Sequence, residues 1–146
     1  MPERLRLLLP GLWAGLLLTV ALIATPAPFA TLVQAEAGRV VARVLASEAY
    51  ASLALGLLAL VLERRAARQG AEQGGTQFTG GMALALGAIF CTVAGYFALQ
   101  PLMGPARMGQ GPLSFGQLHA ASAAFYLAKL VCVILLAWRA TARPSS

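Results

Sequence analysis

Four long apolar segments dominate this chain and constrain its fold more than any other feature. An α-helix rises about 1.5 Å per residue, so about 20 apolar residues cross a bilayer core about 30 Å thick. Only 11% of the 146 residues are charged, whereas soluble domains usually carry about 25%. We therefore expect an all-α polytopic membrane protein, an antiparallel four-helix transmembrane bundle that forms a single domain over residues 1–146, with spans at about 7–33, 40–62, 81–103 and 115–138.

The basic residues flank these spans and predict an orientation. They do not gather in one patch, so the net charge of +6 does not indicate a nucleic-acid binder. Seven arginines lie on the side of the two termini and the 63–80 loop, namely Arg4, Arg6, Arg64, Arg65, Arg68, Arg139 and Arg143. Three lie on the other side, namely Arg39, Arg43 and Arg107. The positive-inside rule then places both termini and this loop in the cytoplasm.

Two further features refine this topology. Trp13 and Trp138 lie near the cytoplasmic ends of their spans, where aromatic rings favour the interface. The glycine-rich loop 63–80 is expected to be a flexible connector. A signal peptide is the alternative for the first segment, because Ala35-Glu36-Ala37 resembles a cleavage site. The apolar run is far longer than the 7–15 residues of a signal core, so we expect it to be retained as a span.

Glycine and proline predict how the helices pack and where they end. Gly11 and Gly15 have the G-x-x-x-G spacing that lets helices approach closely, and we expect them to pack within the molecule rather than in a dimer. A ridge of small residues on the third span, Gly87, Cys91 and Gly95, should seat a neighbouring helix. Pro26 and Pro28 should kink or end the first helix, and Pro101 with Gly104 should break the third.

Polar side chains at membrane depth are the strongest candidates for a site. Span 115–138 carries polar residues within an arc of about 80°. Such groups are costly facing lipid, so they normally face the bundle interior. Helical rise puts Glu48, in the second span, at about the depth of Ser122 and Tyr126. We predict an interhelical cluster that consists of Glu48, His119, Ser122, Tyr126 and Lys129, with Arg43 near its outer mouth.

Two interpretations of this cluster stay open. Intramembrane ionisable residues usually have a function, but the same groups would also pair to hold the helices together. In a further alternative, the aliphatic part of the Lys129 side chain extends toward the cytoplasmic interface, so that the ammonium leaves the cluster.

The sequence predicts no metal and no cofactor. His119 is the one histidine, so bis-histidine haem ligation within one chain is excluded. Met103, Met108 and His119 lie in or beside the outer turn between the third and fourth spans, and thioether and imidazole ligands suit Cu(I). Their spacing matches no metal motif. Cys91 and Cys132 are expected to be small buried apolar residues. Nucleophile triads, phosphate loops and paired catalytic carboxylates are absent, so the pattern does not favour an enzyme.

Several stretches resemble the transmembrane protein 205-like family, also listed as domain of unknown function 4149. They are Trp13-Ala14-Gly15, Ala27-Pro28-Phe29, the stretch from Ala37-Gly38-Arg39 to Ser47-Glu48-Ala49, and Phe115-Gly116-Gln117-Leu118-His119-Ala120-Ala121-Ser122. The last resembles the family signature Phe-Gly-x-Leu-His-Gly-x-Ser, with Ala120 in place of glycine. The resemblance, which extends to bacterial members of the family, implies a four-helix integral protein of a bacterial inner membrane. It gives Phe115, Gly116, His119 and Ser122 as motif positions of unknown role.

Three functions remain as hypotheses. The first is export or permeation of a small solute or metal through the polar cluster, which the association of a eukaryotic relative with platinum-drug resistance favours. The second is a non-catalytic membrane assembly subunit, which binds another membrane protein or forms an oligomer through its glycine faces. The third is a redox or metal-binding protein centred on His119.

Overall fold

The computed structural model describes residues 2–72, 75 and 77–142, and within them every regular element is a helix. The elements are α1 (Pro2–Thr19), the π-helical η1 (Val20–Ala24), the 3-10 helical η2 (Ala27–Ala30), α2 (Gln34–Ala71), α3 (Gly80–Thr92), the π-helical η3 (Val93–Ala98), α4 (Gln100–Arg107) and α5 (Phe115–Thr141).

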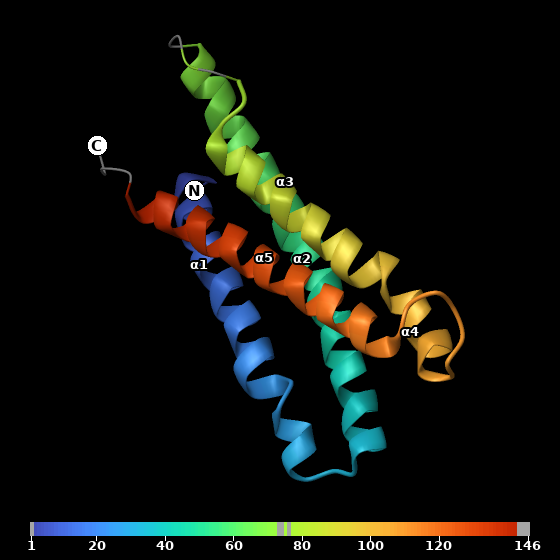
Figure 1. Ribbon diagram of the computed structural model, residues 1–146. Coiled ribbons are helices and arrows are strands. Elements are labelled where there is room, and N and C mark those ends of the chain that lie inside the picture. The colour runs from blue at the N-terminus through green and yellow to red at the C-terminus, as the bar shows by residue number, and fades with distance from the viewer. Residues whose placement is uncertain (1, 73–74, 76, 143–146) are drawn as a thin grey trace.

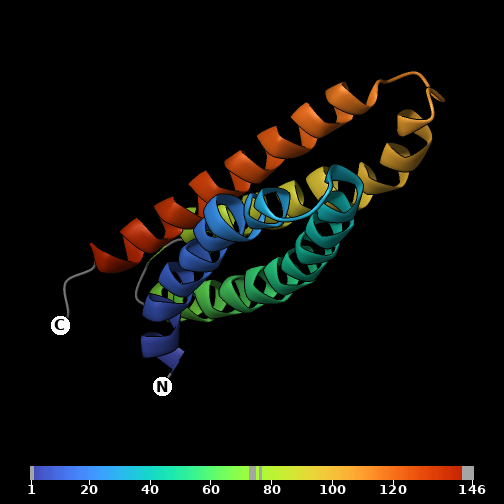
Figure 2. The ribbon, with the colours of Figure 1, turned by 90° about the horizontal axis from the view of Figure 1, so that it is seen from below.

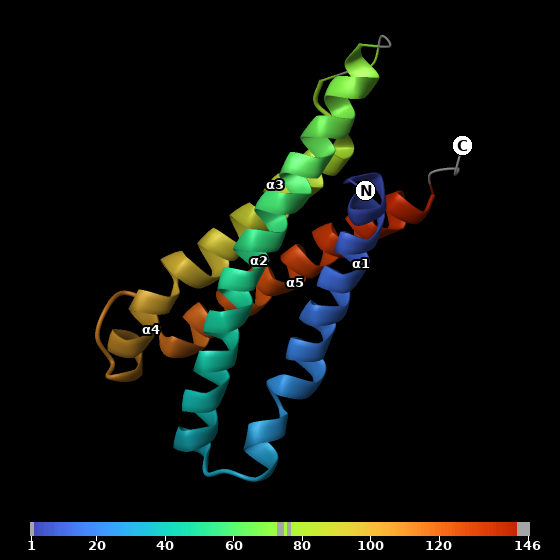
Figure 3. The ribbon, with the colours of Figure 1, turned by 180° about the vertical axis from the view of Figure 1, so that it is seen from behind.

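These elements form four helical runs that are long and apolar enough to cross a membrane; the runs are Glu3–Ala30, Gln34–Ala71, Gly80–Arg107 and Phe115–Thr141. Successive runs point in opposite directions (Figures 1 and 3). The start of α1, the end of α2, the start of α3 and the end of α5 lie at one end, which we call the terminal end. The α1–α2 turn and the α4–α5 loop lie at the opposite end, the turn end. The predicted antiparallel four-helix bundle is confirmed.

The helices are arranged so that α2 and α5 lie diagonally across the bundle. Each of them packs mainly against α1 and α3, and Figure 2 shows α5 and α2 on opposite sides of the other two helices. The core is built from small side chains and a few large ones, among them Trp13, Leu17 and Val133. Large apolar residues such as Leu12 and Phe90 point outward, 71% and 64% exposed. This outward apolar surface is what a lipid environment requires.

The first run ends as its prolines predict. The N–H of Thr25 bonds the carbonyl of Val20, five residues back, in place of the usual i−4 bond. A proline follows, and the chain tightens into η2 before α2 begins. The helix is interrupted at Thr25 and Pro26, because the proline ring clashes with the preceding turn and proline has no N–H to donate.

The predicted flexible loop 63–80 is wrong in its first half. Helix α2 continues without interruption to Ala71. Residues 63–69 are Glu, Arg, Ala and Gln, all strong helix formers, and the first glycine comes only at Gly70. Thr79 then caps α3 by accepting a bond from the N–H of Met82 (3.3 Å).

The third run also differs from its prediction. The regular helix gives way to a π-helical segment at η3, and α4 begins directly before Pro101. Proline is tolerated in a first helical turn, because its missing N–H would have no partner there. Gly104 does not break the helix; α4 runs on to Arg107. The chain reverses only at Gly109 and Gly111, whose φ angles are +71° and +96°.

Candidate functional site

A buried ion pair joins the two diagonal helices. The ammonium of Lys129, on α5, lies 2.6 Å from Oε1 of Glu48, on α2. The two residues are 3% and 5% exposed. Helical rise puts Lys129 deeper along its helix than Glu48, and the long lysine stem closes that gap. Lys129 therefore pairs across the bundle and does not reach for the interface.

A chain of hydrogen bonds extends this pair to α1. The hydroxyl of Ser52 donates to Oε1 of Glu48, one helical turn away on α2. The indole Nε1 of Trp13 donates to the Ser52 hydroxyl oxygen at 3.0 Å. Both Trp13 and Ser52 are fully buried, so the predicted interfacial position of Trp13 is wrong. Trp138 does project outward, with 72% of its surface exposed.

Tyr126 completes the cluster from the side of α5. Its hydroxyl donates to the backbone carbonyl of Leu17 at 2.8 Å, and its ring centroid lies 4.6 Å from the Lys129 ammonium, a cation–π contact. We call Trp13, Glu48, Ser52, Tyr126 and Lys129 the central cluster. It links α1, α2 and α5.

Ser122 and His119, predicted to share this cluster, lie elsewhere. The Ser122 hydroxyl donates to the carbonyl of Gly95 at 2.8 Å and ties α5 to the third run. His119 is exposed on the first turns of α5, where it stacks on Phe115 with ring centroids 5.8 Å apart. The guanidinium of Arg107 lies 4.6 Å from the Phe115 ring centroid. The early turns of α5 pack against α4 and η3, too far along the helix to reach Glu48.

Arg43 is exposed, but it shares a cavity with the central cluster. A groove of about 380 Å³ runs between α1 and α2, and Arg43 and Glu48 both line it. Its other lining residues are Leu16, Val20, Val44, Ser47 and Ala51. Glu48 thus has two surroundings, since its Oε1 is bonded in the core while part of the residue forms the groove wall. The predicted position of Arg43 near the mouth fits this geometry.

The predicted small-residue faces have different outcomes. On the third run, a Cβ on Gly87 would lie 3.3 Å from the sulfur of Cys132, and one on Gly95 would collide with Phe125. That ridge, with the buried Cys91 between them, seats α5 as expected. Gly11 and Gly15 have nothing from the described chain within 4 Å of a Cβ. The expectation that they pack inside the molecule is therefore wrong.

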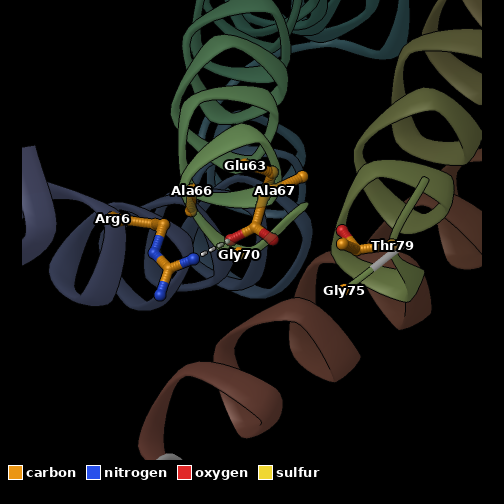
Figure 4. Close-up of a pocket in the computed structure, with 7 residues that line it drawn as sticks. All are labelled: Arg6, Glu63, Ala66, Ala67, Gly70, Gly75 and Thr79. Carbon is orange, nitrogen blue, oxygen red and sulfur yellow. Dashed lines mark ion pairs between the residues drawn. The ribbon is translucent and has the colours of Figure 1, made fainter. Parts of the chain in front are cut away.

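A second polar cluster lies at the terminal end (Figure 4). Arg6 forms ion pairs with Glu3 at 2.7 Å and with Glu63 at 3.8 Å. Glu63 is 5% exposed and lines a cavity of about 360 Å³ with Arg6, Gly70, Gly75 and Thr79. Gly81, at the start of α3, leaves no room for a Cβ beside the Glu63 carboxylate. The sequence pattern marks Arg6 only as a charge that flanks the first span, and no local signal points to its contact with Glu63.

The central cluster holds a carboxylate, an ammonium and three neutral donors. In the described part of the chain, no group of three or more His, Cys, Asp or Glu side chains lies close enough together to hold a metal ion. Cys91 and Cys132 are free thiols. Gly116 lies in the first turn of α5, where Ser114 and Gln117 form a capping box.

The fold and these contacts define a four-helix integral membrane protein with an ion pair at its centre. The family model described as domain of unknown function (DUF4149) matches residues 8–112, more than two thirds of the chain, and the protein belongs to this family. The matched range includes Trp13, Glu48 and Ser52 and ends before the Phe115–Ser122 motif. No curated protein and no solved structure matches the chain.

Proposed function

We propose that the protein is a small membrane transport protein in which the groove between α1 and α2 leads a solute to the central cluster. One observation carries the proposal: Glu48 forms an ion pair with Lys129 and also lines the groove. A ligand in the groove would therefore meet one half of the ion pair directly.

The energetics of burial favour a role beyond packing. Burying two charges is costly, and replacing a buried ion pair by apolar residues of similar size is often neutral or stabilising. A bundle that needed only to hold α2 against α5 could use apolar side chains at both positions. Charged residues at membrane depth commonly mark solute or proton paths.

The charges around the groove favour an anionic solute. Arg43 lines the cavity, and Lys129 lies directly behind Glu48. Two cations thus face one carboxylate. An anion in the groove would compete with the Glu48 carboxylate for the Lys129 ammonium.

Purified protein in proteoliposomes tests the proposal, with radiolabelled succinate, phosphate and chloride as probes. We expect uptake of at least one anion, and Glu48→Gln should lower its rate by about tenfold or more, since loss of a buried charged partner is costly. Glu36→Gln is the matched control, because Glu36 is an exposed acid on the same helix, 53% exposed at its side chain. The double variant Glu48→Gln/Lys129→Gln separates folding from function: it carries no unpaired charge and should insert normally without transport.

Uptake that Glu48→Gln leaves unchanged would contradict the proposal. Failure of all three anions to enter wild-type vesicles would also contradict it and would favour a structural role for the central cluster, which would then only hold the helices together.

A second candidate function, a membrane assembly subunit, is favoured by the open face of α1. Gly11 and Gly15 lie on it one turn apart with no neighbour in the described chain, a spacing that admits close helix approach. Cross-linking in membranes should then capture a complex that Gly11→Ile/Gly15→Ile abolishes. Recovery of free monomers alone would exclude this function.

A further inference from the structure

Helix α2 extends well beyond the membrane core at the terminal end. Its 38 residues span about 57 Å, whereas the hydrocarbon core is about 30 Å thick. The apolar sequence stops at Leu62, and the helix continues for nine residues to Ala71. Residues 64–68 thus lie about 3–9 Å past the last apolar residue, at the depth of the lipid headgroups.

Three arginines occupy one face of this extension. Arg64, Arg65 and Arg68 fall within an arc of about 100° on α2, and all three are exposed. Among the described residues, none of the ion pairs involves them. The nearest acids are Glu63, which turns to the inner side and pairs with Arg6, and the exposed Glu72 at the end of the helix.

The same face continues as an apolar stripe toward the membrane centre. Leu57, Leu58 and Val61 are 55%, 39% and 47% exposed, and their helical positions overlap those of the three arginines within the same side of α2. An amphiphile lying along this face would meet alkyl side chains over its tail and guanidinium groups at its head. Nucleic acid or an acidic peptide would use the arginines alone.

We propose that Arg64, Arg65 and Arg68, with Leu57, Leu58 and Val61, form a binding site for an anionic phospholipid. Guanidinium groups bind phosphate oxygens through paired N–H donors, and the acyl chains pack along the apolar stripe. The site lies along residues 57–68 of α2, nearer the terminal end than residues 43–51, through which α2 lines the groove, and it does not depend on the transport proposal.

Titration of the detergent-purified protein with phosphatidylglycerol and phosphatidylcholine, followed by native mass spectrometry, tests this site. We expect phosphatidylglycerol to bind more tightly, and Arg64→Gln/Arg68→Gln to weaken it by about tenfold. Arg64→Lys/Arg68→Lys keeps the charge and loses the paired donors, so an intermediate loss is expected. The matched control is Arg4→Gln/Arg139→Gln, which removes two exposed charges from the same end. It should change the affinity by less than about twofold.

Three results would overturn the site. They are equal affinity for the two lipids, an equal loss in the control variant, and equal binding of soluble glycerol phosphate, which lacks the tail. Thermal unfolding of each variant in detergent checks that the bundle is intact. Because Arg64 and Arg68 are exposed, we expect melting curves that match wild type, and matching curves show that a change in lipid affinity does not come from loss of folding.

Discussion

The ion pair between Glu48 and Lys129 makes each residue dependent on the other. Lys129→Met removes the ammonium that lies 2.6 Å from the Glu48 carboxylate. Among the described residues, it leaves the buried anion with the Ser52 hydroxyl as its hydrogen-bond donor. Loss of one partner of a buried pair typically costs roughly 3–5 kcal/mol. We expect Lys129→Met to lower the free energy of unfolding by about this amount, measured by denaturant titration in detergent micelles.

The double variant is the control for this effect. Glu48→Gln/Lys129→Met removes both charges, and an amide still accepts a bond from Ser52. Its stability should return to within about 1–2 kcal/mol of wild type. A double variant as unstable as Lys129→Met alone would show that the two charges do not act on each other.

At this scale the sequence predicted part of the cluster. Helical rise gives each residue a depth and puts Glu48 level with Tyr126, and the shared polar arc of span 115–138 adds the deeper Lys129. The rotation of each helix about its axis depends on packing, which no local pattern reports. For this reason Trp13 was assigned to the interface, although it is fully buried and bonds Ser52. A tryptophan one turn from Leu17 on an otherwise aliphatic face was the signal that could have found it.

At the scale of elements, contact between the third run and α5 depends on glycine. A Cβ at Gly95 would collide with Cβ of Phe125, so Gly95→Ala must push the two helices apart. Overpacking of this kind costs typically 1–3 kcal/mol, and we expect that loss in the unfolding free energy.

Gly104→Ala is the matched control, because nothing in the described chain lies within 4 Å of a Cβ there. Within α4 that change should be neutral or stabilise by up to about 1 kcal/mol. A Gly95→Ala protein as stable as wild type would mean that the helices do not approach as closely as the structure places them.

Element boundaries were predicted where composition changes and missed where it does not. The proline pair after Thr25 ends the first run at its predicted place. Residues 63–71 look like a loop only if the end of hydrophobicity is taken as the end of the helix. Their helix propensity carries α2 onward, and the Arg6–Glu63 contact holds that extension against the start of α1.

The whole molecule shows a charge asymmetry that the folded chain preserves. Among the described residues, six arginines flank the terminal end, namely Arg4, Arg6, Arg64, Arg65, Arg68 and Arg139. Three flank the turn end, namely Arg39, Arg43 and Arg107. Arg143, counted in the sequence-based prediction, lies outside the described residues. The fold also places α2 and α5 on a diagonal, bridged by the ion pair. Pairwise helix patterns do not report that diagonal.

This asymmetry predicts the orientation of the protein. Glu72→Cys and Gln110→Cys place one exposed thiol at each end, while Cys91 is buried and Cys132 half-buried within the bundle. A membrane-impermeant maleimide should label Gln110→Cys on intact spheroplasts of a bacterial host and label Glu72→Cys only after lysis. The unsubstituted protein, which should stay unlabelled in both preparations, is the control. The reverse labelling pattern would mean the opposite orientation. The expected pattern puts Arg43 at the outer mouth of the groove and places Arg64, Arg65 and Arg68 in the anionic cytoplasmic leaflet, where their attraction to lipid is greatest.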